Sequence, residues 1–421
     1  MRRLAVIVFL LVCSAIAQAA APADCWKLRK DGHRTQAQAC FETLTQSSEA
    51  YYRAEGFWGL EQWERANEQF RLATQPADSK ALYKVRWGRL LFERFNSADA
   101  ADLFHEALQK DPSNAAAYLG LARVFADNFD GKAAESCAKA IELDPRLPDG
   151  HELMAQLELE NGDRTAAAAE ADKAIALESD ALDAMAIHAG IELIADRSPD
   201  TWIARMQAVN PGYGEGYALV AHELELNYRY EDAVTYYRKA IEADPRLWSA
   251  HSALGIDLMR LGKEDEPRKE LELSYENGYR DAATVNSLRL LDSYKNFETF
   301  RDDTTIVKLD KSEADVLLPY IQPELHAIIA AYEKKYRMKL PAPVQVEVYP
   351  NHDDFAVRTT GMPGLGALGV TFGEVVAMDS PSGRKPGDFN WGSMLWHEMS
   401  HVFILTATNH RVPRWFTEGL A

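Results

Sequence analysis

Ala140-Ile141-Glu142-Leu143-Asp144-Pro145 returns as Ala240-Ile241-Glu242-Ala243-Asp244-Pro245, and this repeated segment determines the fold of a large part of the chain. The same point recurs about every 34 residues, marked by Pro112, Pro145, Ser179, Pro211 and Pro245. A small residue stands five positions before four of these marks, at Ala107, Ala140, Ala174 and Ala240. Small residues let two helices approach closely, and proline cannot continue a helix. The pattern therefore predicts a series of helix pairs.

This pattern resembles the tetratricopeptide repeat, which has an antiparallel helix pair in each unit. About seven units fit between residues 40 and 280, with Gly88 and Gly255 at the small-residue position of a first helix. The resemblance implies an all-α solenoid over residues 20–285, whose concave groove would hold a peptide or a partner protein. The alternative is that the solenoid is only a spacer. Five histidines in this region are interpreted as packing or surface residues without a shared spacing: His105, His151, His188, His222 and His251.

A second stretch, His397-Glu398-Met399-Ser400-His401, predicts a metal site by its spacing. On a helix, histidines four residues apart leave the same face, so both imidazoles can bind one ion. Glu398 lies between them and can take the proton of an activated water. Leu395, Met399, Val402 and Thr406 recur at helical spacing and should form a separate, mostly apolar face.

The segment Trp415-Phe416-Thr417-Glu418-Gly419-Leu420-Ala421 adds a carboxylate downstream. Two histidines and one glutamate form a catalytic zinc ligand set with an open fourth position. Together the two segments resemble the gluzincin metallopeptidases. The resemblance implies that His397, His401 and Glu418 bind zinc, that Glu398 is the general base, and that Gly419 lets its helix approach the histidine helix closely. The alternatives are an ordinary helix with surface histidines, or a metal site that does not turn over.

The hydrophobic pattern changes near residue 290, which predicts a linker at 286–302 and an α+β metallopeptidase-like domain over 303–421. Strands are expected at 304–309, 344–349, 367–372 and 374–378, and helices at 314–337, interrupted or restarted at Pro323, and at 353–358. By the gluzincin resemblance, strand 374–378 or its hairpin partner would lie at the sheet edge and pair with extended substrate. The alternative is an ordinary structural hairpin.

Residues 1–19 read as a secretory signal peptide, with Arg2 and Arg3 before a short apolar run. The run is too short to span a bilayer, which predicts a periplasmic or secreted protein without a transmembrane span. In an oxidising compartment Cys25 and Cys40 are the expected disulfide pair, with Cys137 as a free thiol; three buried thiols are the alternative. The net charge of −18 argues against binding nucleic acid through bulk electrostatics.

The sequence thus predicts an exported Zn²⁺-dependent metallopeptidase that hydrolyses peptide bonds in a peptide or protein substrate. The alternative is a periplasmic tetratricopeptide-repeat scaffold with a non-catalytic peptidase-like domain. The Gly-x-Met-Glu-Asn signature of aminopeptidases is absent from the sequence, so an aminopeptidase is not expected. The sequence stops inside the Glu418 helix, which suggests either a fragment or a curtailed catalytic domain. The transition-state stabiliser that gluzincins place after this helix has no counterpart in it.

Overall fold

The computed structural model describes residues 21–421 except residues 129, 386, 388 and 389. The expected signal peptide, residues 1–19, lies outside this described part. Contacts divide the chain into two compact units, residues 1–112 and 113–421. The expected domain boundary near residue 285 falls inside the second of these units, which contains both the later repeats and the sheet.

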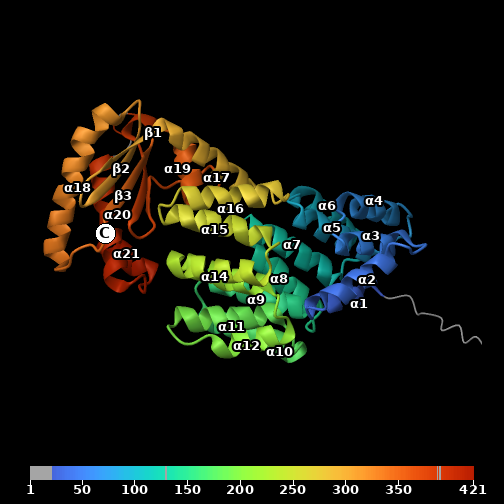
Figure 1. The fold of residues 1–421 in the computed structure, drawn as a ribbon. Coiled ribbons are helices and arrows are strands. Elements are labelled where there is room, and N and C mark those ends of the chain that lie inside the picture. The colour runs from blue at the N-terminus through green and yellow to red at the C-terminus, as the bar shows by residue number, and fades with distance from the viewer. Residues whose placement is uncertain (1–20, 129, 386, 388–389) are drawn as a thin grey trace, which may run out of the picture. The chain divides into compact units, whose positions relative to one another are not determined.

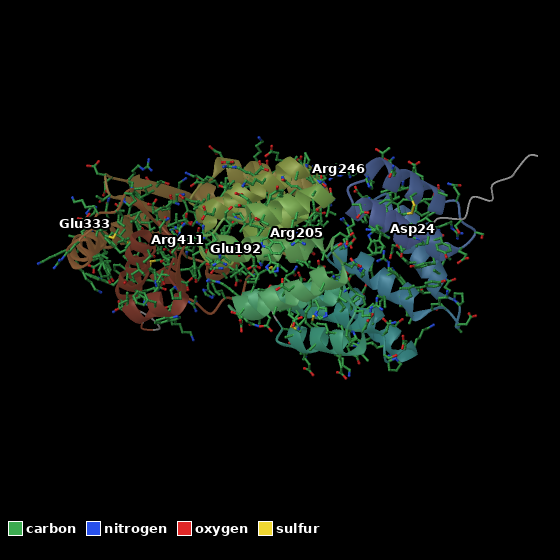
Figure 2. The ribbon with its side chains drawn as sticks, turned by 90° about the horizontal axis from the view of Figure 1, so that it is seen from below. Asp24, Glu192, Arg205, Arg246, Glu333 and Arg411 are labelled. Atoms are coloured by element: carbon green, nitrogen blue, oxygen red, sulfur yellow. A yellow bond between two sulfur atoms is a disulfide. The ribbon has the colours of Figure 1, made fainter. Side chains whose placement is uncertain are left out.

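The first unit consists of helical hairpins (Figure 1). Its helices are α1 Pro22–Lys30, α2 Arg34–Leu44, α3 Ala50–Gly59, α4 Trp63–Thr74, α5 Ala81–Glu93 and α6 Ser97–Lys110. A disulfide joins Cys25 on α1 to Cys40 on α2, as expected, with 5.4 Å between their Cα atoms. It is the yellow bond near Asp24 in Figure 2. A Cβ at Gly88 would lie 2.7 Å from the ring of Phe104, so this glycine allows α5 to pack closely on α6.

The second unit begins with five further hairpins of the same kind. Their helices are α7 Ala115–Asp127, α8 Lys132–Leu143, α9 Pro148–Glu160, α10 Arg164–Leu177, α11 Leu182–Ile194, α12 Asp200–Val209, α13 Gly214–Leu226, α14 Tyr230–Ala243, α15 Trp248–Arg260 and α16 Asp265–Glu276. The helices α8 and α14 end two residues before Pro145 and Pro245, and an extended aspartate separates each helix from its proline. A Cβ at Gly255 would lie 2.7 Å from the Leu271 side chain, which confirms the expected small-residue position.

Two of the repeat histidines share a position, contrary to expectation. His151 and His251 each lie six residues after the marking proline, and each contacts that proline's carbonyl oxygen at 3.3 Å through Nε2. Their Nδ1 atoms lie 2.7 Å from Glu170 and 2.6 Å from Glu270, on the second helix of the same hairpin. These histidines therefore join the parts of each repeat, which agrees with the expected packing role.

A five-stranded sheet follows the repeats, in the order β1-β2-β3-β5-β4. The strands are β1 Phe297–Arg301, β2 Thr305–Asp310, β3 Val344–Tyr349, β4 Gly369–Thr371 and β5 Val375–Asp379. The pairs β2–β3 and β3–β5 are parallel, and the outer strands β1 and β4 are antiparallel to their neighbours. In this register Val346 lies opposite both Val307 and Val376. The remaining elements are α17 Ala282–Ser293, η1 Tyr294–Asn296, α18 Ala314–Tyr336, α19 His352–Thr360, η2 Pro381–Gly383, α20 Trp391–Thr408 and α21 Arg414–Leu420.

Both faces of the sheet are covered (Figure 1). Val346 and Val376 point to a core shared with α18 and α20. The neighbouring residues along the strands point to the opposite face, where Val375 and Tyr349 pack with α19 and with the last repeats. Alternate residues of a strand face opposite sides, so a sheet buried on both faces needs two helical layers. The end of the solenoid supplies one of them.

Two differences from the sequence expectation have physical causes. The expected linker 286–302 forms the end of α17, then η1 and β1, because Asp281 caps α17 by accepting from the Thr284 amide at 3.0 Å and β1 pairs with β2.

The expected break in helix 314–337 is absent, and α18 runs through Pro319 and Pro323. Both prolines are exposed, so the carbonyl groups left without an amide partner can face solvent.

No helix within the described ranges combines the length and the apolar character needed to cross a bilayer.

The Cys25–Cys40 disulfide predicts how many thiols of the mature chain react and how stable the first unit is. It closes a loop with a sequence separation of 15 residues, which should stabilise the first unit by about 3 kcal/mol. Replacing Cys25 and Cys40 together by Ala should lower the denaturation midpoint of this unit accordingly. The unfolded, non-reduced mature chain should label at one thiol, Cys137, which is buried when folded. Labelling at three thiols would contradict the pairing.

A buried carboxyl in the repeats predicts a pH-dependent stability. Glu223 on α13 is 1% exposed, and its Oε2 atom has no hydrogen-bond partner among the described residues. Burial raises the pKa of Glu223 to about 7, while His222 opposes this. Because the unfolded pKa is about 4.3, the stability associated with the neutral carboxyl is present at low pH and is lost as pH rises toward 7.

Glu223→Gln cannot ionise, so its stability relative to the parent should rise by roughly 2–3 kcal/mol between pH 5 and pH 8. Urea unfolding at the two pH values measures this difference. Glu135→Gln, at an exposed position on α8, is the matched control and should show no such change. An equal response of the two variants would contradict the assignment to Glu223.

Candidate metal centre

The helix α20 is fixed in place by its apolar face. Asn390 caps its start by accepting from the Ser393 amide at 3.1 Å. Leu395, Met399 and Val402 are fully buried against the sheet and α18. Thr406, the fourth residue of the expected apolar face, is half-buried. Burial of this face directs the histidine face of the same helix away from the core.

Hydrogen bonds to side chains of α18 fix α20 further. The Tyr332 hydroxyl donates to the Trp396 carbonyl oxygen at 3.0 Å, and Trp396 Nε1 donates to Glu324 at 2.6 Å. Tyr336 and Ser400 share a hydrogen bond of 3.2 Å between their hydroxyl oxygens. The segment that carries both histidines is therefore held by three hydrogen bonds to one neighbouring helix.

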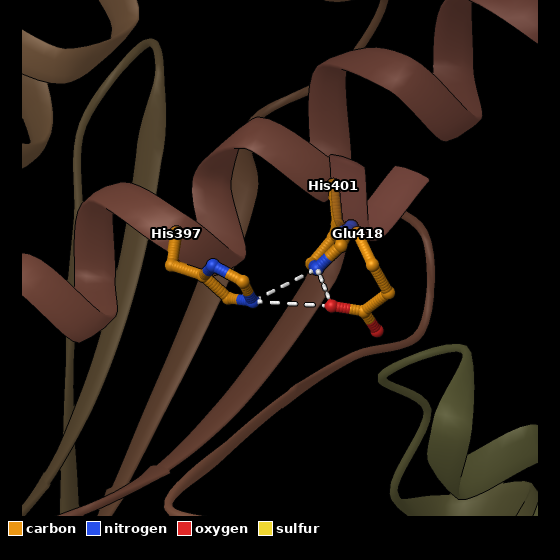
Figure 3. A group of neighbouring side chains, drawn as sticks. All are labelled: His397, His401 and Glu418. Atoms are coloured by element: carbon orange, nitrogen blue, oxygen red, sulfur yellow. Dashed lines mark hydrogen bonds and ion pairs between the residues drawn. The ribbon is translucent and has the colours of Figure 1, made fainter. Parts of the chain in front are cut away.

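The structure brings His397, His401 and Glu418 together (Figure 3). The Nε2 atoms of His397 and His401 lie 3.1 Å apart. The Glu418 Oε2 atom lies 3.6 Å from Nε2 of His397 and 3.7 Å from Nε2 of His401. His401 is nearly buried at its side chain, whereas 38% of His397 and 46% of Glu418 are exposed. The group thus has a buried side and a side open to solvent.

These distances fit a zinc ion. Tetrahedral zinc with bonds of about 2.0–2.1 Å holds neighbouring ligand atoms roughly 3.3 Å apart. The separations of the three ligand atoms, 3.1, 3.6 and 3.7 Å, bracket this value, so the three side chains could bind one zinc ion together. Imidazole nitrogen and carboxylate oxygen are both zinc ligands, and the open side leaves room for a fourth.

Glu398, the predicted general base, is held beside this group and is 4% exposed. The Thr371 hydroxyl lies 2.8 Å from Glu398 Oε2 and 3.0 Å from the Glu398 carbonyl oxygen. Burial raises the pKa of Glu398 to about 7; the Thr371 hydrogen bond lowers that pKa, and the Glu418 carboxylate raises it.

Sequence reasoning placed a strand at 367–372 but did not link it to Glu398. A Cβ at Gly369 would lie 2.8 Å from Glu398 Cγ and 2.9 Å from its Oε1, so this glycine makes space for the carboxyl. Gly369 and Thr371 both belong to β4. Neither residue has a spacing or motif that links it to the metal-binding segment, and only the folded sheet reveals the contact.

The structure decides between the two strands expected at the sheet edge. Strand 374–378, as β5, lies between β3 and β4, so its hairpin partner β4 forms the edge. The expectation for Gly419 is wrong. A Cβ at Gly419 would meet nothing within 4 Å, so this glycine is not needed for close approach to α20. The helix α21 instead presents its Gly419 side to open space.

Comparisons with known proteins recognise the repeats. Residues 91–157 match the family model of the tetratricopeptide repeat, so the chain contains this repeat. Proteins with this repeat bind protein partners. No curated protein matches the chain.

Several solved structures are similar to this chain. One is the Cut9–Hcn1 hetero-tetramer of APC/C, at 11% identity and TM-score 0.42, covering 64% of this chain and 54% of that chain. A thermophilic repeat protein of Thermus thermophilus has 17% identity and TM-score 0.36, covering 42% of this chain and 99% of that one. A repeat protein of Parabacteroides merdae has 14% identity and TM-score 0.41, and the match covers 58% of this chain and 98% of that one. This chain thus spans about half the length of the first. Likeness at this level carries no conclusion about function, and the gluzincin resemblance stays a prediction.

The contact between β4 and Glu398 predicts that replacement by alanine changes the stability of the protein at Gly369 but not at Gly366. Gly369→Ala should destabilise the protein by about 1–3 kcal/mol, because the new methyl group must displace the buried Glu398 side chain. Gly366→Ala is the control, since a Cβ there meets nothing within 4 Å. Urea denaturation of both variants measures the difference. Equal stabilities would show that Glu398 is not confined by this strand.

Proposed function

We propose that this protein is an exported zinc-dependent peptidase whose metal centre is carried by a tetratricopeptide-repeat scaffold. The scaffold for protein interaction is supported by the family match over residues 91–157. The peptidase is carried by one observation, the convergence of His397, His401 and Glu418 beside the buried carboxyl of Glu398. A closed structural zinc site has four protein ligands, whereas three ligands and an open side are typical of catalysis.

The residues divide the chemistry between them. His397, His401 and Glu418 would hold the ion. A zinc ion bound there supplies Lewis-acid activation of water and of the scissile carbonyl group. Glu398 takes a proton from the attacking water and later delivers it to the leaving amine. Its hydrogen bond from Thr371 at 2.8 Å keeps the carboxyl oriented during both transfers.

A peptide substrate is favoured by the position of β4. This strand is at the edge of the sheet, and its residues Gly369 and Thr371 contact Glu398. An extended peptide can add to an exposed strand edge through main-chain hydrogen bonds. A peptide bound along β4 would therefore pass beside the general base. The groove of the repeats would bind the substrate protein or a partner.

Export is part of the proposal. The expected signal peptide motivates it, and the Cys25–Cys40 disulfide is consistent with an oxidising compartment such as the periplasm. Protease protection tests the location by comparing intact cells with spheroplasts, in which the outer membrane is disrupted. Protein found only in the cytoplasmic fraction would contradict export.

The second candidate function is a repeat scaffold whose metal centre does not cleave peptides, and the same experiment tests it. The family match favours it, because the repeat is a protein-interaction module. Both proposals share the fold and the ligand residues. They differ only in whether Glu398 does chemistry, so a variant of this residue separates them.

Glu398→Gln keeps the side chain's size and removes the base, so zinc content should survive while peptide hydrolysis falls by about 10²–10⁴-fold. His397→Ala should lose zinc and activity together, because it removes a ligand. Metal analysis of purified full-length protein and hydrolysis of a broad peptide library measure the two properties. Glu298→Gln, exposed on β1 at the opposite sheet edge, is the control.

The outcome decides between the two functions. Stoichiometric zinc in the parent protein with no cleavage of any library peptide would favour the scaffold and reject the peptidase. Absence of bound zinc after dialysis against Zn²⁺ would reject both versions of the metal centre. In a crystal grown with zinc, the ion should lie about 2.0–2.2 Å from all three ligand atoms.

A further inference from the structure

The connector between the two ligand-bearing helices, residues 409–413, decides where Glu418 lies relative to the histidines. The helix α20 ends at Thr408 and α21 begins at Arg414. Within the connector, Asn409 and His410 have φ values of 49° and 60°, two successive left-handed residues that are not glycine. Such conformations cost free energy and persist only where surrounding contacts impose them.

One of these contacts comes from the repeats. Arg411 Nε lies 2.6 Å from both carboxylate oxygens of Asp196, a residue 215 positions earlier in the chain. Asp196 lies in the turn between α11 and α12 and is itself left-handed, with φ 56°. The contact therefore ties the connector to a turn of the solenoid.

The Asp196 turn is itself anchored. Arg229 is 9% exposed, and its Nη1 donates to the Leu193 carbonyl oxygen at 2.6 Å and to Asp196 at 3.5 Å. Its Nε donates to Asp232 at 2.7 Å. Asp196 is thus presented to Arg411 by a fixed part of the solenoid rather than by a loose loop.

A second contact acts on the neighbouring residue. The His410 ring packs on Gly373 in the β4–β5 turn, where a Cβ would lie 2.9 Å from the ring. A backbone group of Tyr228, in the turn between α13 and α14, also interacts with His410. Two turns of the repeats and one turn of the sheet therefore meet at the connector.

We infer that Asp196 is a positioning residue for the metal centre, which acts through Arg411 to place Glu418 beside His397 and His401. The inference rests on the proposed metal centre. It makes the repeats a structural part of that centre, because docking of the connector on the solenoid favours the position of the third ligand.

The size of the effect follows from exposure. The side chains of Asp196 and Arg411 are 45% and 37% exposed. A pair of this kind contributes at most about 1 kcal/mol, which corresponds to roughly a fivefold change in an equilibrium constant. Zinc affinity should therefore fall about two- to fivefold when the pair is lost, since His397 and His401 remain as ligands.

The experiment is a double-mutant cycle on full-length protein, with Zn²⁺ affinity measured by competition with a chromogenic chelator. Asp196→Ala and Arg411→Ala should each weaken Zn²⁺ binding, and the double variant should bind no more weakly than either single one. The visible absorption of bound Co²⁺ should lose intensity in the same variants, because a protein ligand is displaced. Arg411→Ala changes nothing within the solenoid itself, so it remains informative if Asp196→Ala folds poorly.

Glu192→Ala is the matched control. It removes a carboxylate from the same region of α11, where Glu192 pairs with Arg197 rather than with the connector. Its Zn²⁺ affinity and Co²⁺ spectrum should equal those of the parent. Parent-like Zn²⁺ affinity in Asp196→Ala and Arg411→Ala, or additive losses in the double variant, would overturn the inference while leaving the metal centre intact. A parent protein that binds no Zn²⁺ would overturn the proposed function as well.

Discussion

The buried ion pair between Arg358 and Glu347 is the contact on which the arrangement of the second unit depends. Both residues are 2% exposed, and Arg358 Nε donates to Glu347 at 2.7 Å. Arg358 Nη2 also donates to the Met259 carbonyl oxygen at 2.7 Å, so one guanidinium joins α19, β3 and α15. Burial alone would raise the pKa of Glu347, but Arg358 and Lys308 outweigh burial and lower it. Leaving either charge unpaired there would cost about 3–5 kcal/mol.

This junction accounts for the position of the metal centre. Because the last repeats cover one face of the sheet, α18 and α20 are left to cover the other. The apolar residues of α20 then occupy the core, and His397 and His401 lie on the other side of this helix, His401 nearly buried and His397 partly exposed. The edge strand β4 confines Glu398 through Gly369 and Thr371. The two histidines and the base are thus placed by the packing of α20 against the sheet.

The repeats have two roles in this arrangement. As tetratricopeptide repeats they offer a surface for protein partners. As a structural support they supply Met259 to the sheet junction and Asp196 to the connector between the ligand helices. The second role explains why the later repeats belong to the same compact unit as the sheet, whereas the first hairpins form a unit of their own.

The sequence by itself determined the features that depend on local periodicity. Helix pairs followed from a recurring proline and small residue, and the convergence of His397 and His401 followed from their spacing of four on a helix. The expected break at Pro323 was wrong only because the exposure of this proline was unknown. The tertiary structure alone decided which strand is the edge, which residues confine Glu398, and that Asp196 meets Arg411. Those contacts join residues of different elements, up to 215 positions apart, and no periodic pattern in one segment encodes a partner in another.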